Sequence, residues 1–142
     1  MALKKQFDHR LFTVLLFDEH RSESQRLYSS SPADYPVGGR KAVVTSEWTT
    51  RLYEQQRPFI GRDAAAIRQH FFDHELILSL GCESIINLPV VFNRRTLGTL
   101  NLLHKAHWFG DEHVPHGELF AALAVPALQE ALKSNANEYR TT

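Results

Sequence analysis

Cysteine is almost absent from the sequence, since Cys82 is the only one among 142 residues. A single thiol excludes an intrachain disulfide and a cysteine-based zinc cluster, and it fits a reducing compartment. A chain of this length can bury a sufficient core without such cross-links. We therefore expect a single domain over residues 1–142, with a core at about 10–134 and a frayed tail at 135–142.

The sequence also lacks an excess of either charge, because 16 Lys and Arg residues balance 16 Asp and Glu residues. Without a net field, neither nucleic acid nor an anionic membrane is an expected partner. Long hydrophobic runs are missing too: residues 11–17 are interrupted by Thr13 and are too few to cross a bilayer. Residues 1–10 are charged and do not resemble a secretory signal. We expect a cytoplasmic protein.

Four segments have the composition and spacing of β-strands. Residues 11–18 (LFTVLLFD) are largely apolar at both alternating sets of positions, so this strand should be covered on both faces. Residues 24–30 alternate less cleanly and predict a more exposed strand that pairs with the first as a hairpin. Only three residues separate the runs at 84–92 and 96–103, and so short a connection joins antiparallel neighbours.

The region between the two hairpins predicts a loop followed by short helices. Residues 31–39 (SPADYPVGG) contain two prolines and two glycines, which favour a loop. Thr45 or Ser46 can cap a first helix, and Asp63 can cap a second helix over residues 64–72. The sequence therefore predicts a small helical layer here rather than a crossover made of one helix.

Two more helical segments complete the predicted architecture. Asp73 can begin a further turn or two, which Gly81 ends as a C-terminal cap. A closing helix is expected over residues 115–134, kinked or restarted near Pro126, because an interior proline removes a backbone donor. This helix, aided by the N-terminal segment, should cover one face of the sheet, and the layer at 48–80 should cover the other. A small-molecule pocket is expected at the seam between that layer and the sheet.

Several short motifs, taken in order and spacing, resemble the GAF family. The strongest piece is a Leu-Pro-Val strand paired with a Gly-Thr-Leu-Asn-Leu strand across a short turn. The matching segments are LLFD at 15–18, RLYSS at 26–30, YPVG at 35–38, NLPV at 87–90, LGTLNL at 97–102, then Phe109, Asp111 and Glu112 ahead of the closing helix.

This resemblance implies an α+β fold with a central antiparallel sheet, helices on one face that often form dimers, and a small-molecule pocket on the other face. Functions in the family span cyclic-nucleotide sensing, tetrapyrrole binding, other metabolite sensing and, rarely, reduction of free methionine sulfoxide. We expect a sensory or regulatory module that binds a small molecule, forms a homodimer, has no output domain of its own and is not an enzyme. No cofactor is expected beyond an unidentified small-molecule ligand.

Two other functions stay open. A reductase would use Cys82 as its nucleophile, but the sulfenic product would have no second cysteine to resolve it. A lone cysteine next to a strand is more often a small buried residue. A bilin is not expected either, because Cys82 lacks the neighbouring motif of bilin-attaching members. The other alternative is a structural dimerisation module whose pocket is filled by side chains.

Two further patterns have a functional and a simpler explanation. Lys105, Phe109 and the acidic pair at 111–112 partly match a cyclic-nucleotide signature, but acidic residues ahead of a helix are also favoured by the helix dipole. Histidines occur at ligand-like spacing, but a metal or haem site would require them to converge with a further donor such as Asp73 or Glu75. We expect no metal. These histidines are His70 and His74, and His104, His107, His113 and His116.

The second hairpin supplies the polarity of the predicted pocket. Pairing of Phe92 with Thr96 places Asn87 opposite Asn101, with Thr99 on the same face. Buried amides must be satisfied by each other, by backbone, by water or by a ligand. We predict that this pair faces the helical layer and orients a small molecule. Mutual satisfaction is the alternative, and a one-residue register slip would separate the amides.

The helical layer and the loop before it supply the other predicted contacts. Trp48, Phe71 and Tyr28 are expected to form apolar walls. Arg40 and Lys41, beside two glycines, can hold an anionic group or can simply solvate the loop. The full set of predicted ligand-contacting residues is Tyr28, Tyr35, Lys41, Trp48, Phe71, Asp73, Asn87, Thr99 and Asn101.

Overall fold

The computed structural model describes residues 10–141 and has an α+β fold. Within that range six strands form one antiparallel sheet in the order β3-β2-β1-β6-β5-β4. The strands are β1 (Leu11–Asp18), β2 (Glu23–Ser29), β3 (Arg40–Ala42), β4 (Phe59–Gly61), β5 (Ser84–Phe92) and β6 (Arg95–His104). The four strands predicted from the sequence are confirmed. The three-residue strands β3 and β4 at the two edges were not predicted, because segments this short show no periodicity.

The β5–β6 hairpin has the predicted register at its centre and a different turn at its end. Asn87 pairs with Asn101, as expected, whereas Phe92 pairs with Arg95 rather than with Thr96. Asn93 and Arg94 have φ values of 52° and 63°, so the turn holds two residues with left-handed backbones. The turn is therefore one residue shorter than predicted. A bulge between Val90 and Val91 shifts the pairing by one residue, which restores the predicted register at Asn87 and Asn101.

The predicted helical layer is present and begins where its caps predict. It consists of α2 (Glu47–Thr49), the π-helix η1 (Thr50–Glu54), α3 (Ala64–His70) and α4 (His74–Ser79). Ser46 caps α2 by accepting a hydrogen bond from the Thr49 amide, and Asp63 caps α3 by accepting one from the Ala66 amide. Gly81 ends the layer with a φ of 77°, a conformation that favours glycine.

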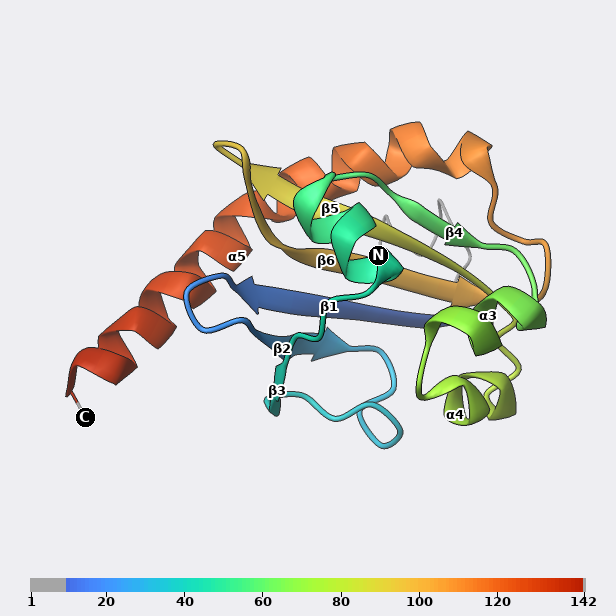
Figure 1. The fold of residues 1–142 in the computed structure, drawn as a ribbon, viewed down its shortest axis with the longest axis horizontal. Coiled ribbons are helices and arrows are strands. Elements are labelled where there is room, and N and C mark those ends of the chain that lie inside the picture. The colour runs from blue at the N-terminus through green and yellow to red at the C-terminus, as the bar shows by residue number, and fades with distance from the viewer. Residues whose placement is uncertain (1–9, 142) are drawn as a thin grey trace.

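The closing helix α5 (Val114–Thr141) follows a short 3-10 turn, η2 (Asp111–His113), and lies across β5, β6 and β1. Pro126 lies inside this helix, and Figure 1 shows the helix changing direction between its orange and red halves. The helix continues past Ser134, where we expected the tail to fray. None of the described helices is long and apolar enough to span a bilayer.

Each face of the sheet packs a separate part of the core. On the α5 face, Leu16, Leu88 and Leu102 are fully buried in one cluster. On the other face, Ile67 of α3 and Ile77 of α4 pack against strand residues such as Ile85 in a second cluster. The prediction that α5 and the helical layer cover the two faces is therefore confirmed, whereas the expected contribution of the N-terminal segment lies outside the described residues. Figure 1 shows the two layers on opposite sides of the strands.

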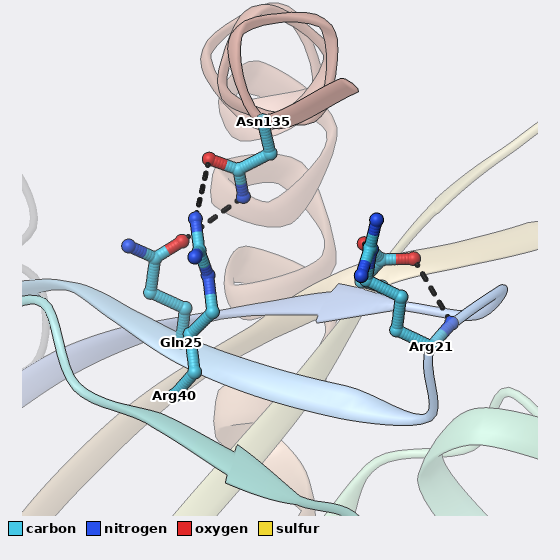
Figure 2. Close-up of polar contacts among 5 residues, drawn as sticks. Arg21, Gln25, Arg40 and Asn135 are labelled. Atoms are coloured by element: carbon cyan, nitrogen blue, oxygen red, sulfur yellow. Dashed lines mark hydrogen bonds and ion pairs between the residues drawn. The ribbon is translucent and has the colours of Figure 1, made fainter. Parts of the chain in front are cut away.

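Polar contacts fasten the C-terminal part of α5 to the β2–β3 edge of the sheet. The Asn135 amide nitrogen donates to Gln25 Oε1 at 3.0 Å, and Asn135 Oδ1 accepts from an Arg40 Nη atom at 3.3 Å. Figure 2 shows Asn135 pointing from the helix toward both side chains. The nearby Arg21 instead contacts Asp18 at the β1–β2 turn, with an amide hydrogen bond of 3.3 Å. Asn135 thus connects the end of the long helix to two strands.

Candidate functional site

The candidate site is the face of the sheet that lies beneath α2, η1, α3 and α4. Side chains alternate along each strand, so Thr13 and Leu15 of β1, Thr99 and Asn101 of β6 and Asn87 of β5 share this face. Asn87, Thr99 and Asn101 are 1%, 0% and 4% exposed. The sequence prediction that these three residues lie together is therefore confirmed.

The two amides form a hydrogen-bonded chain that runs from the helical layer to β1. Trp48 Nε1 donates to Asn87 Oδ1 at 3.0 Å, and Asn87 Nδ2 donates to Asn101 Oδ1 at 2.6 Å. Asn101 Nδ2 then donates to the Thr13 hydroxyl at 3.2 Å. Both amide oxygens are thus taken by protein donors. The alternative of mutual satisfaction describes this structure, and the amides position Trp48 rather than face an open space.

Aromatic rings occupy the layer above this network. Trp48 makes edge contacts with Tyr53 and Phe71, at centroid distances of 5.8 and 5.9 Å. Tyr53 also stacks on Phe17 of β1 at 4.3 Å, and Phe59 contacts Phe71 at 6.0 Å. Burial in this cluster raises the pKa of Tyr53. The predicted walls Trp48 and Phe71 are adjacent, as expected, but rings fill the seam where we expected a pocket.

A second polar cluster lies beside the rings and joins β2, the following loop and α4. The Tyr35 hydroxyl donates to Asp73 Oδ2 at 2.8 Å, and the Arg26 guanidinium lies 4.8 Å from the centroid of the Tyr35 ring. Burial, and then the Asp73 carboxylate, raises the pKa of Tyr35. Asp73 therefore binds Tyr35 with its side chain and does not cap α4 with it.

Two buried polar atoms on this face have no hydrogen-bond partner among the described residues. They are the Thr99 hydroxyl oxygen and the Nε atom of Arg26. Leu15 pairs with Arg26 on one side and with Thr99 on the other, so both residues belong to one row across the sheet. Burial lowers the pKa of Arg26, while Tyr35 and Asp73 oppose that shift. Arg26 was not among the predicted site residues. The signal that could have identified it is a charged residue within a strand whose face is covered by another layer.

Solved structures with the same architecture were found by structural comparison, whereas no family model and no curated protein matches the sequence. The GAF domain of an Acinetobacter phosphoenolpyruvate-protein phosphotransferase superposes with a TM-score of 0.72 at 12% identity, covering 94% of this chain and 79% of that chain. The chain has a GAF-domain fold. The α+β expectation, with a central antiparallel sheet between two helical layers, is thus confirmed.

Two other similar structures differ in what they do. A far-red cyanobacteriochrome photoreceptor matches with a TM-score of 0.68 and 14% identity, over 91% of this chain and 81% of that chain. A type II free methionine-R-sulfoxide reductase from Thermoplasma acidophilum matches with a TM-score of 0.67 and 12% identity, over 91% and 85%. At these identities the likeness establishes the GAF fold alone.

Two of the predicted ligand contacts lie outside the candidate site. Tyr28 points to the α5 face, where its ring contacts Phe12 at 5.4 Å. The cause is a bulge: Tyr28 pairs with Val14 and Arg26 pairs with Leu15, so the extra residue puts Tyr28 and Arg26 on opposite faces. The prediction that Tyr28 forms a wall of the pocket is therefore wrong.

Lys41 is exposed on the edge strand β3, and its Nζ atom lies 5.3 Å from the centroid of the Phe72 ring. The other half of the predicted basic pair, Arg40, contacts Asn135 on the opposite face. Gly38 and Gly39 have open space around them. The alternative that this basic pair solvates the edge fits the structure better than a shared anion site does.

The histidines and Cys82 have structural surroundings. No three His, Cys, Asp or Glu residues in the described part of the chain come together in a way that could hold a metal ion. His70 packs against Phe59 at 4.9 Å, and His104 packs against Trp108 at 4.3 Å. Cys82 is 1% exposed in the second core cluster, and burial raises the pKa of its thiol.

Two cavities lie elsewhere, and of the rings in the aromatic layer only Phe59 lines one of them. A groove of about 470 Å³ runs between α5 and the sheet, lined almost entirely by apolar residues that include Phe12, Tyr28 and Leu123. A more polar cavity of about 610 Å³ lies at the β4 edge, between that strand and the α2–η1 segment. Of the predicted ligand-contacting residues, only Tyr28 lines either cavity, and it lines the apolar groove.

Proposed function

We propose that this chain is a sensory or regulatory GAF module that binds a small molecule on the sheet face beneath the helical layer, and that it is not an enzyme. The observation that carries the proposal is the pair of unpartnered buried atoms at Arg26 and Thr99. A buried polar group without a partner costs about 1 to 3 kcal/mol, so folded proteins retain few of them. Two such groups in one row across the sheet indicate a partner that the protein itself does not supply.

The chemistry of the two groups indicates what that partner carries. The Arg26 Nε–H can only donate a hydrogen bond, and the Thr99 hydroxyl has a proton to donate. A ligand that satisfies both atoms therefore presents oxygen acceptors, as a carboxylate, a carbonyl or a phosphate does. Trp48 and Phe71, both partly exposed, would pack against its apolar part. Binding requires the rings of the α2–η1 segment to move, and short helices are suited to such motion.

The burial and the raised pKa of Cys82 support a binding function rather than a reductase function. The thiolate is the nucleophilic form of cysteine, and a raised pKa keeps this thiol protonated near neutral pH. Arg10 opposes the shift, but burial is the larger effect. The Cys82 side chain is enclosed by apolar residues such as Ile67, Ile77 and Ile85. The reductase hypothesis would be supported only if the protein showed thiol-dependent reductase activity that Cys82→Ser abolishes.

A second candidate function is a structural dimerisation module, and a separate observation favours it. The α5 face exposes Tyr28, Leu119 and Leu123 beside an apolar groove, at 44%, 60% and 67% of their surface. Exposed apolar residues that cluster on one helix are typical of association surfaces. We propose that the chain forms a homodimer through α5, and this does not conflict with ligand binding on the opposite face. Sedimentation of the protein and of a Leu119→Glu/Leu123→Glu variant tests the dimer.

Ligand binding is tested by Thr99→Val, with Thr96→Val as its matched control. Both threonines lie on β6 and both are buried, but the Thr96 hydroxyl donates to the Tyr53 carbonyl at 2.9 Å. Native mass spectrometry and a thermal-shift screen of nucleotides and carboxylates would first identify a ligand. At about a hundredfold excess over its Kd, a ligand should raise Tm by roughly 5 to 10 °C.

The two variants should then separate cleanly. Thr99→Val should keep or gain stability in the free protein, by about 1 kcal/mol, and lose the ligand-induced shift. Thr96→Val should lose stability and keep the shift, since its partners are protein groups. A screen with no ligand at all, together with a Thr99→Val protein less stable than the parent, would favour the purely structural module.

A further inference from the structure

The cavity at the β4 edge lies outside the site proposed above. Its walls come from the α2–η1 segment on one side and from β4 and the residues after it on the other. Figure 1 shows β4 at the border of the sheet, with the α2–η1 coils beside it and in front of β5 and β6. At about 610 Å³ the cavity has the volume of a small-molecule site.

Arg51 is the first of two guanidinium groups in this cavity. It belongs to η1, a π-helix of five residues, and such π-turns often occur at functional sites. Its Nε atom donates to the Pro58 carbonyl at 2.5 Å, which fixes the guanidinium against the loop that leads to β4. Because the side chain is already held by this bond, less conformational entropy is lost when it contacts an anion.

Arg62 is the second guanidinium, and it faces an internal competitor. One of its Nη atoms lies 3.4 Å from Asp111 Oδ1, and the two side chains are 52% and 86% exposed. An ion pair this exposed contributes at most about 1 kcal/mol. A carboxylate or phosphate from solution could therefore replace Asp111 at little cost.

The remaining lining residues suit an anion with a flat apolar body. Phe59 and Ile60 of β4 supply an apolar wall, and the hydroxyls of Thr45 and Thr50 supply polar contacts. His70 closes the wall behind the Phe59 ring, with the two rings 4.9 Å apart. Glu47, also in the lining, disfavours a ligand of high negative charge.

We propose that this cavity is a second ligand site, which binds a small organic anion through Arg51 and Arg62 and packs its apolar part against Phe59. The bidentate fork of arginine matches both carboxylate and phosphate groups. This site is distinct from the sheet-face site, because none of its lining residues belongs to the row that contains Arg26 and Thr99, although the α2–η1 segment borders both.

The test is a titration of the whole protein with benzoate and phenyl phosphate, followed by amide chemical shifts. Benzamide, which has the same ring without a charge, is the neutral control, and inorganic phosphate is the control without a ring. We expect saturable shifts for benzoate or phenyl phosphate at residues 45–51 and 59–62. Benzamide and inorganic phosphate should each bind at least tenfold more weakly. Comparison of benzoate with phenyl phosphate identifies which anionic group is preferred.

Substitutions then separate this site from a general attraction of anions. Arg51→Ala and Arg62→Ala should each weaken binding about tenfold, which is the effect expected from losing a charged hydrogen bond. Arg57→Ala is the matched control, since Arg57 is a nearby exposed arginine outside the cavity, and it should leave binding unchanged. Asp111→Asn should tighten binding by up to about fivefold because it removes the competitor of Arg62.

Three outcomes would overturn the proposal: no saturable shift at these residues with either anion, equal binding of benzamide, or equal weakening by Arg57→Ala. Thr99→Val should not alter this titration. A negative anion titration would therefore leave the sheet-face proposal intact. A negative result in the Thr99→Val test would likewise leave the proposal of a second site intact.

Discussion

The two faces of the sheet are covered by elements of opposite character. Helix α5 covers one face with a single element of 28 residues, and the strand side chains beneath it are almost all apolar. The other face is covered by α2, η1, α3 and α4, which have three to seven residues each. Beneath them lie Asn87, Thr99 and Asn101.

This difference has a physical basis in how helices satisfy their backbones. A long helix pairs most of its own amides and carbonyls, so it can lie on an apolar surface without polar help. In a short helix most backbone N–H and C=O groups belong to the terminal turns and have no partner within the helix. These groups require caps and nearby polar side chains. The α5 face is thus suited to stability, whereas the opposite face combines polar groups with short helices, which are the features that the proposed ligand site uses.

The largest expected effect is on the α5 face, at Gly98. A Cβ atom there would overlap the Leu15 carbonyl oxygen and would lie 2.8 Å from Leu128 Cδ2. Because the first contact is with backbone, side-chain movement cannot relieve it. Gly98→Ala should lower the free energy of unfolding by about 3 kcal/mol or more, measured by urea denaturation.

Gly39→Ala is the control for that substitution, since no atom lies within 4 Å of its Cβ position. Its effect should stay within about 0.5 kcal/mol. A Gly98→Ala protein as stable as the parent would mean that β1 and β6 separate more easily than this packing indicates.

The next effect concerns the amide network on the opposite face. Asn101→Leu removes the partner of Asn87 Nδ2 and the donor to the Thr13 hydroxyl, leaving buried groups unpaired. We expect a loss of about 2 to 4 kcal/mol in unfolding free energy. Because Asn87→Leu breaks the same network, the double variant should cost less than the sum of the two single variants by at least about 0.5 kcal/mol. If the losses of unfolding free energy in the two single variants simply add in the double variant, the two amides do not act as one unit.

The comparison of the two faces also shows what the sequence could predict. The register of Asn87 and Asn101 followed from alternation and a short turn, and the bulge at Val90 preserved it even though the turn is one residue shorter than expected. The helix caps at Ser46 and Asp63 were local signals and were found. Local patterns of this kind depend on few contacts and survive small errors elsewhere.

What could not be predicted depends on contacts between distant segments. Alternation cannot reveal the bulge in β2 that turns Tyr28 to one face and Arg26 to the other. It identifies which residues face the helical layer, but it cannot show that the rings of Trp48, Tyr53 and Phe71 close the seam. The part of α5 past Ser134 likewise makes a tertiary contact that no local pattern reveals, the hydrogen bond between Asn135 and Gln25.

A smaller effect is expected from the dependence of folding stability on pH. It arises at Cys82, which is buried in the core cluster beneath the short helices. Burial raises the pKa of Cys82 above that of an exposed thiol, so the folded protein holds this proton more tightly than the unfolded chain does. The resulting contribution to stability is complete below about pH 8.5, the ordinary thiol value, and is lost as the pH rises above it. Urea denaturation between pH 7 and 10 should show this decrease.

Cys82→Ala should remove the part of that decrease which begins near pH 8.5. Tyr35 and Tyr53 also have raised pKa values, and their contributions are lost only as the pH rises above about 10. The two ranges therefore distinguish the thiol from the phenols. An unchanged slope between pH 8 and 10 in Cys82→Ala would show that Cys82 is not the group responsible.

The smallest effect is expected at Asn135, which connects the stable face to the edge of the sheet. Asn135→Ala removes the contacts with Gln25 and Arg40, but alanine favours helix by about 0.6 kcal/mol relative to asparagine. The two changes nearly cancel, so global stability should shift by less than about 0.5 kcal/mol. The contacts should matter locally instead, because they hold the last turns of α5 against β2 and β3. Hydrogen exchange of amides 132–141 should accelerate several-fold in Asn135→Ala and stay unchanged in Ser134→Ala, an exposed neighbour without a described side-chain contact. Equal exchange in both variants would show that α5 beyond Ser134 is held by its own helical hydrogen bonds and not by the sheet.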